Sequence, residues 1–275
     1  ANASSSASAS QHNQHSALPY SHNSNPNPNH AVYGEFSQPG LVMDWNQQCG
    51  RVATAASSGR IRIWNVNSEQ LANEIIVGRS EVVTTMQTDV PGNQLLVGDY
   101  RGLVRRYDLR EKLTNSGTIL YHHTSPVVGA QIQRNSASLI VSGAAGGDVI
   151  VCDPRALSSN GFDAKGRNRS RSSEKAVGRG TIMKLIAHPE KAILDAFAVH
   201  DYAPVCATGS RGQFATIIDL RGGGRRIKHI RYQEGFLGQR MGPVDALTFH
   251  QHDLLLAAGG KDVFVSTYVG RLSKR

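Results

Sequence analysis

The chain has 275 residues, 39 % of them apolar, and a net charge of +9, enough apolar material for one large folded domain or two small ones. Its three cysteines stand far apart and never in a C-x-x-C pair, which argues against a disulfide framework or a zinc site and favours small buried residues in a reducing compartment. No apolar run approaches the roughly 20 residues of a membrane helix, and no signal-peptide pattern opens the chain, so we expect a soluble intracellular protein.

Residues 1–30 form the first segment and contain no Asp, Glu, Lys or Arg. They are mainly Ser, Asn, Ala, His and Pro, a composition that cannot bury enough apolar surface to offset the entropy lost on ordering. We therefore expect a disordered linker at 1–30, followed by one folded region at 31–275. The histidines of the linker are irregularly spaced, which fits low-complexity sequence better than a metal site.

From about residue 40 onward, one pattern of strands repeats five times. Each repeat has an apolar strand, a second strand ending in small residues, a Gly-containing turn, and a third strand in which apolar and polar residues alternate. A fourth apolar segment follows most of these third strands. The third strands are RIRIWNV (60–66), LVRRYDL (103–109), DVIVCDP (148–154), QFATIID (213–219) and DVFVSTY (262–268).

The spacing of these repeats is typical of WD-repeat propeller blades. The residues at the end of the third strands are Trp64, Tyr107, Cys152, Ile218 and Tyr268, with intervals of 43, 45, 66 and 50 residues. A WD repeat spans about 40–45 residues and forms one four-stranded blade. The sequence thus predicts an all-β WD-repeat β-propeller with five visible four-stranded blades. We expect the aromatic residues of this set to pack in the core rather than to stack on a ligand.

Polar residues of the repeats predict structural hydrogen bonds. Asp108, Asp153 and Asp219 take the second place of the Trp-Asp dipeptide. His122 or His123, followed by Ser142 and Asp148, suggests the buried hydrogen-bond set that orders a WD blade, because buried polar groups need partners.

A basic insert at about 155–180 explains the long third interval. It carries seven Lys or Arg residues against two carboxylates, a net charge of +5. Ser170 and Ser172 each follow an arginine by three residues, so both are candidate phosphosites in a regulatory loop, although the sequence favours the alternative of an unregulated disordered insert. The same charge could contact nucleic acid, but the insert has no interleaved aromatic residues for base stacking.

Motifs of catalysis are absent from the sequence: it has no G-x-S-x-G elbow, P-loop, H-E-x-x-H or EF-hand loop. Gly222-Gly223-Gly224 follows a strand but opens no helix, so a turn at the edge of a blade explains it better than a phosphate site. We expect no catalytic, cofactor-binding or metal-binding residues, and a propeller enzyme is the weakest of the functional alternatives.

Two segments carry a resemblance to a known family. GFLGQRMGPVDALTFH (235–250) resembles the last blade of the Raptor family, the regulatory subunits of the TOR kinase complex known as Kog1 or Mip1 in yeasts. GLVMDWNQQCGRVATAASSGRIRIWNV (40–66) resembles an internal Raptor blade, and the similarity runs from about residue 40 to 270. The resemblance implies the C-terminal WD-repeat region of such a subunit, with five of seven blades, and hence a fragment or a broken gene model.

The resemblance implies a non-catalytic adaptor that recruits substrates and regulators to the TOR kinase in amino-acid signalling and cell growth. Its partners would be the kinase, other complex subunits, small GTPase regulators and kinase substrates, with no membrane span. Its location would be the cytoplasm, with recruitment to the surface of the lysosome or vacuole. The alternative is an unrelated WD-repeat adaptor that associates with nucleic acid through its basic loop.

The segment 235–240 supplies the candidate partner contacts. Phe236 and Arg240 stand in a glycine-flanked connection between two blades, where loops run over the surface and aromatic and Arg side chains are favoured at interfaces. The alternative is structural: Phe236 would fill the gap between two blades and Arg240 would pair with a nearby carboxylate.

Overall fold

The computed structural model describes residues 40–56, 58–78, 81–110, 117–134, 138–155, 180–188, 192–232, 242–260 and 265–269. These residues form nineteen β-strands in five antiparallel sheets. The first sheet contains β1 (Leu41–Asn46), β2 (Arg51–Ala56), β3 (Arg60–Asn65) and β4 (Gln70–Ile76). The second contains β5 (Val83–Thr88), β6 (Gln94–Asp99), β7 (Leu103–Asp108) and β8 (Thr118–His122).

The other three sheets repeat this order. The third contains β9 (Val127–Ile132), β10 (Ile140–Ala144), β11 (Asp148–Cys152) and β12 (Thr181–Ile186). The fourth contains β13 (Leu194–Val199), β14 (Val205–Ser210), β15 (Phe214–Asp219) and β16 (Arg225–Arg231). The fifth contains β17 (Val244–Phe249), β18 (Leu255–Gly260) and β19 (Val265–Val269), so its described part has three strands rather than the four expected. The predicted WD-repeat propeller architecture is confirmed.

Each sheet is a meander whose strands pair in the order of the sequence. The turn between the second and third strands holds a glycine with positive φ in three sheets, at Gly59, Gly102 and Gly147. Its carbonyl accepts a hydrogen bond from the chain that leaves the fourth strand, as in the 2.8 Å bond from His123 N to Gly102 O. A Cβ on Gly102 would lie 2.5 Å from the carbonyl oxygen of His123, so this turn excludes larger residues.

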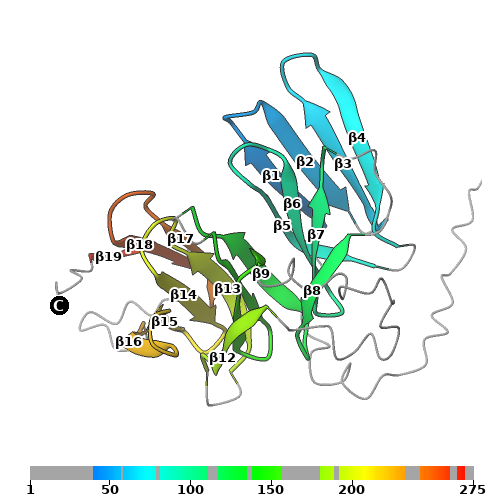
Figure 1. The fold of residues 1–275 in the computed structure, drawn as a ribbon. Helices are drawn as coiled ribbons and strands as arrows, with labels where there is room; N and C mark the ends of the chain where they lie inside the picture. Colours follow the sequence, from blue (N-terminus) through cyan, green and yellow to red (C-terminus); the bar gives the residue numbers. More distant parts are fainter. Residues whose placement is uncertain are drawn as a thin grey trace, which may run out of the picture.

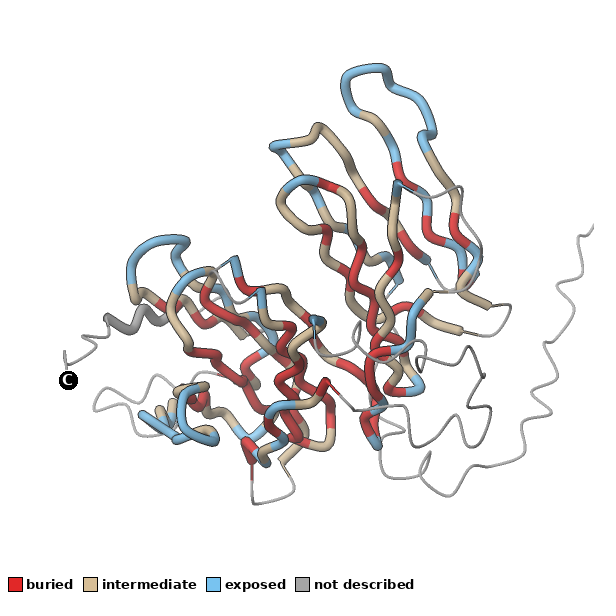
Figure 2. The backbone as a smooth tube through the Cα atoms, viewed as in Figure 1, coloured by how far each residue is buried: buried red, intermediate tan, exposed pale blue. Residues whose placement is uncertain are grey.

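Consecutive sheets pack face to face through apolar residues, as expected for blades that cannot cover both of their faces alone. The first core lies between the first and second sheets and includes Ile61, Ile63, Leu95 and Tyr107. Further cores join the second to the third sheet, the third to the fourth and the fourth to the fifth. The first strands β1, β5, β9, β13 and β17 contact one another in that order (Figure 1). Buried residues are concentrated in the second, third and fourth sheets (Figure 2).

The outer face of the first sheet, which points away from the second sheet, is apolar and exposed. The side chains of Leu41, Met43 and Trp45 alternate along β1 and are 66 %, 63 % and 59 % exposed. Trp64 lies on the same face and is 38 % exposed, whereas its register equivalent Tyr107 is 3 % exposed. The prediction that Trp64 packs in the core is therefore wrong within the described residues, because a position of this kind is buried only when a preceding sheet covers it.

Candidate functional site

The loops that join the first and second strands of all five sheets meet around one cavity. Its volume is about 440 Å³, and each loop contributes to its lining, through Gln48, Val90, Arg134, Asp201 and His250. We call the surface that carries these loops the loop face, and the hollow at its centre the axial cavity. Loops held by a rigid scaffold are common binding surfaces, so the loop face is the candidate functional site.

Side chains of the first strands connect neighbouring sheets at the wall of this cavity. Asp44 accepts hydrogen bonds from the backbone N and the Oγ1 of Thr88, at 2.8 and 2.6 Å. In the same register, Gln87 Oε1 accepts a 2.6 Å bond from Ile132 N, and Gln131 Oε1 accepts a 2.5 Å bond from Val199 N. These inter-sheet bonds use a backbone N–H that no other strand takes up, and they fix one sheet against the next.

A second set of inter-sheet bonds lies two residues further along the chain, at the end of β1 and in the loops that follow β9 and β13. Asn46 Nδ2 donates to the carbonyl of Asp89 at 2.7 Å, and Gln133 Nε2 donates to that of Ala203 at 2.9 Å. His200 accepts bonds at Nδ1 from the backbone of the next loop residues, so its Nε2 carries the hydrogen and donates to Asp253 O at 3.2 Å. The loop face is thus held in one arrangement across its five sheets.

In three sheets, an arginine in the connection from the third to the fourth strand is held in the same way by an aspartate. Arg110, Arg155 and Arg221 each donate from Nε, at 2.9 Å, to the aspartate two residues earlier, and their side chains are 62–65 % exposed. The bonds from Arg110 lower the pKa of Asp108 to about 2, and those from Arg155 and Arg221 lower the pKa of Asp153 and Asp219. The Trp-Asp pattern marks these aspartates in the sequence, but their role in fixing arginines needs the structure.

The predicted hydrogen-bond set of the third sheet is confirmed, with His123 as its histidine. Nδ1 of His123 lies 2.6 Å from Asp148 Oδ2 and Nε2 lies 2.7 Å from Ser142 Oγ, all three residues being buried. Burial acts to raise the pKa of Asp148, but the hydrogen bond and charge of His123 outweigh it and leave that pKa lowered. This set joins β10 and the start of β11 to the chain that enters the third sheet.

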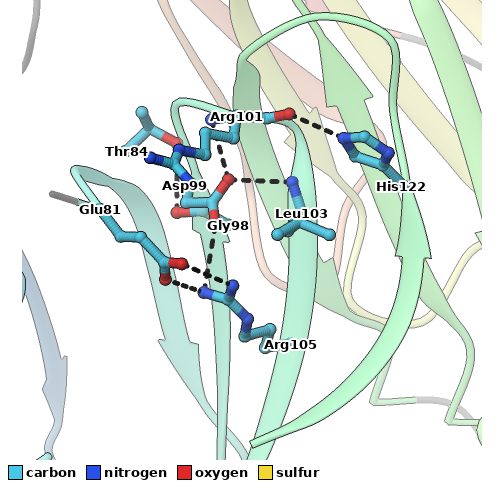
Figure 3. A network of polar contacts seen from close by, with 8 residues as sticks. All are labelled: Glu81, Thr84, Gly98, Asp99, Arg101, Leu103, Arg105 and His122. Carbon is cyan, nitrogen blue, oxygen red and sulfur yellow. Dashed lines mark hydrogen bonds and ion pairs between the residues drawn. The ribbon is translucent and has the colours of Figure 1, made fainter. Parts of the chain in front are cut away.

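The second sheet uses a different polar network at its own β6–β7 turn (Figure 3). The Asp99 carboxylate accepts bonds from the backbone N of Arg101 and Leu103, both 2.9 Å, and pairs with Arg105 at 3.2 Å. Arg105 also forms a two-bond ion pair with Glu81, in the connection from the first sheet. Burial raises the pKa of Asp99 despite these partners. Sequence reasoning missed this network, because Glu81 and Arg105 match no WD pattern.

The residues singled out from the sequence as interaction or modification sites lie outside the described ranges. This holds for Phe236 and Arg240 in the connection to the fifth sheet and for Ser170 and Ser172 in the basic insert, so all four stay predictions. Two of the predicted small buried cysteines, Cys152 and Cys206, are buried, but Cys49 is only half-buried because it lies in a loop. The glycines 222–224 have positive φ and form the predicted turn between β15 and β16.

Metal ligands and membrane-spanning helices were sought over the same part of the chain. No group of three or more His, Cys, Asp or Glu residues among the described residues is arranged to hold a metal ion. Over those ranges the structure also holds no helix with the length and apolar character that a membrane crossing requires.

Comparison with known proteins gives consistent relatives, although no family model matches the chain. It is 32 % identical to "Regulatory-associated protein of TOR 1" of Arabidopsis thaliana over 82 % of its length. It is 29 % identical to "Protein raptor homolog" of Dictyostelium discoideum over 88 %, and 29 % identical to "Target of rapamycin complex 1 subunit mip1" of Schizosaccharomyces pombe over 83 %. The chain spans only 15–16 % of the length of these relatives.

Solved structures support the fold. The crystal structure of Chaetomium thermophilum Raptor matches 84 % of this chain with a TM-score of 0.66 at 21 % identity, and the match covers 20 % of that chain. A chain in the crystal structure of a mitotic checkpoint complex matches 83 % of this chain with a TM-score of 0.60 at 12 % identity, covering 60 % of that chain. At these identities the similarity shows the architecture alone.

Proposed function

Because the chain is a homologue of the Raptor proteins over most of its length, we propose that it is a non-catalytic scaffold region of a Raptor-like subunit of the rapamycin-sensitive TOR complex. The names of the relatives describe a regulatory-associated protein of TOR and a subunit of target of rapamycin complex 1. The observation that carries the proposal is the loop face, where inter-sheet hydrogen bonds join five sheets around one cavity.

A surface fixed in this way suits protein binding. Binding is weakened when loops must become ordered in the complex, so a face already held in one arrangement lowers that cost. The loops also display large polar and aromatic groups, such as Tyr202, which is 46 % exposed and stacks on His252 at a centroid distance of 5.6 Å. Aromatic side chains of this kind are favoured contact residues.

The finer parts of the proposal rest on the family. The loop face would contact the TOR kinase or another subunit of its complex, and the whole subunit would bring small GTPase regulators and kinase substrates to the kinase in nutrient signalling and growth. We propose a cytoplasmic location with recruitment to the surface of the lysosome or vacuole.

Co-purification of the complex tests the proposal. Gln47 and Gln251 are exposed residues of the axial cavity, so Gln47→Arg with Gln251→Arg places two charges on the loop face without removing a buried contact. In the full-length protein this variant should lose most of the co-purifying TOR kinase. Ser58→Arg is the matched control, because Ser58 is exposed in the β2–β3 turn at the other end of the strands. Equal recovery of kinase with both variants contradicts the proposal.

A further inference from the structure

A groove of about 730 Å³ lies between the second and third sheets and opens on the loop face. Its lining comes from the β5–β6 loop, the strand β7, the β9–β10 loop and the chain after β11. We call it the arginine groove, because its charged lining residues are Arg106, Arg134 and Arg155 together with a single carboxylate, Asp89. The volume falls within the range of small-molecule and peptide sites.

Arg106 is the central residue of the argument. It lies on β7 opposite Leu96 and is half-buried, yet its guanidinium has no hydrogen bond or ion pair within the described part of the chain. A guanidinium has five N–H donors and is always charged, so a half-buried one normally has an anionic or carbonyl partner. Arg106 therefore has donors free for an anionic group that enters the groove.

The other two arginines are held in place by aspartates that do not line the groove. Arg155 donates from Nε and Nη2 to Asp153, both at 2.9 Å, and Arg134 pairs with Asp201 at 3.5 Å. Each guanidinium keeps unused N–H groups, because those bonds occupy at most two of its five donors. These pairs restrain the two side chains before a ligand arrives, which reduces the entropy that binding costs.

The rest of the lining suits an extended peptide. Apolar walls come from Val90, Pro91, Ile132, Ile140 and Pro154, and the exposed Tyr202 also lines the groove. Arg134 and Arg155 are each balanced by an aspartate outside the lining, so a phosphate group would be bound through the guanidinium of Arg106, unpaired within the described residues, and the N–H groups that the other two arginines leave unused. A guanidinium binds phosphate through two parallel N–H···O bonds.

We propose that the arginine groove binds a phosphoserine- or phosphothreonine-containing segment of a partner protein, with the phosphate on Arg106 and with Arg134 and Arg155 beside it. The flanking residues of the segment lie along the apolar wall. This inference does not depend on the identity of the TOR complex as the assembly that the chain joins.

The test uses the full chain and a degenerate peptide library with a central phosphoserine, immobilised beside matched libraries with serine or aspartate at the centre. We expect the phosphoserine library to retain at least about tenfold more protein than the serine library, since hydrogen bonds to charged groups contribute about 1.5–3 kcal/mol. Arg106→Gln should remove that preference, and a thermal melt should show that the variant is folded.

A second pair of variants keeps the test decisive if Arg106→Gln fails to fold. Arg155→Gln should weaken retention of the phosphoserine library. Arg221 lies outside the groove but is held by Asp219 in the same geometry as Arg155, so Arg221→Gln should leave retention unchanged. Equal retention of the phosphoserine and serine libraries overturns the proposal. So does equal retention of the aspartate library, or an equal loss in Arg155→Gln and Arg221→Gln, which would reflect general surface charge.

Discussion

His123 and Asp148, 25 residues apart in the sequence, meet in the core of the third sheet with 2.6 Å between Nδ1 and Oδ2. His188, in the connection to the fourth sheet, is also buried, but it contacts Phe214, the residue that stands in place of Asp148 at the start of the third strand. Neither ring nitrogen of His188 has a hydrogen-bond partner among the residues that the structure describes. Two buried histidines in the connections between sheets thus differ in whether their ring nitrogens are hydrogen-bonded.

This contrast predicts that replacing His123 costs much more stability than replacing His188. His123→Leu should lower the free energy of unfolding by about 3 kcal/mol, because the buried Asp148 carboxylate loses its hydrogen bond and keeps only Lys184, 3.9 Å away, as a partner. His188→Leu removes no hydrogen bond and should change stability by less than about 1 kcal/mol or increase it. Urea denaturation of both variants measures the difference. Similar losses in the two would show that the His123–Asp148 contact contributes nothing specific.

The pH dependence of stability should report His188. Burial lowers the pKa of His188 to about 4, with smaller contributions from the charges of His229 and Arg226. Between pH 6.5 and 4 the unfolded chain therefore binds a proton at this residue that the folded chain does not, so stability falls as the pH falls through that range, by roughly 3 kcal/mol in all. His188→Leu should flatten this part of the curve. An unchanged curve would place the titration on other groups.

The inter-sheet hydrogen bonds predict a loss and a gain of stability. Gln131→Leu leaves the N–H of Val199 without a partner and should cost about 1–2 kcal/mol. The fourth sheet has Ala198 in the register of Gln131, with the axial cavity beside it, so Ala198→Gln should add a bond to the fifth sheet and about 0.5–1 kcal/mol. Thermal melts of both variants measure these effects. A destabilising Ala198→Gln would contradict the proposed equivalence of the two positions.

The outer face of the first sheet should make the isolated chain self-associate. Exposed apolar patches and uncovered sheets promote aggregation, and Leu41, Met43 and Trp45 form such a patch. The triple change to serine should lower the average mass measured by light scattering at a given concentration. The same change at the exposed polar residues Gln70, Asn67 and Glu69 should leave it unaltered. A monomeric wild-type chain would show that this face needs no cover.

The sequence predicts the strands well because each repeat shows the same local pattern. An apolar strand, a turn glycine and a strand of alternating apolar and polar residues recur at a nearly fixed spacing. The His123 set is predictable for the same reason. The inter-sheet bonds are not, because equivalent positions hold Asp44, Gln87 and Gln131 and their partners are backbone groups of another sheet. The exposure of Trp64 is also unpredictable locally, since it depends on whether another sheet covers it.

Site-specific photo-crosslinking in cells tests the scaffold role of the loop face most directly. A benzoylphenylalanine introduced at Gln251, in the axial cavity, should yield covalent adducts with a subunit of the TOR complex when the full-length protein is purified. The same residue introduced at Ser58, in the β2–β3 turn, should yield none of these adducts. Adducts from position 58 alone, or no adduct from position 251 in an intact complex, would contradict a binding role for the loop face.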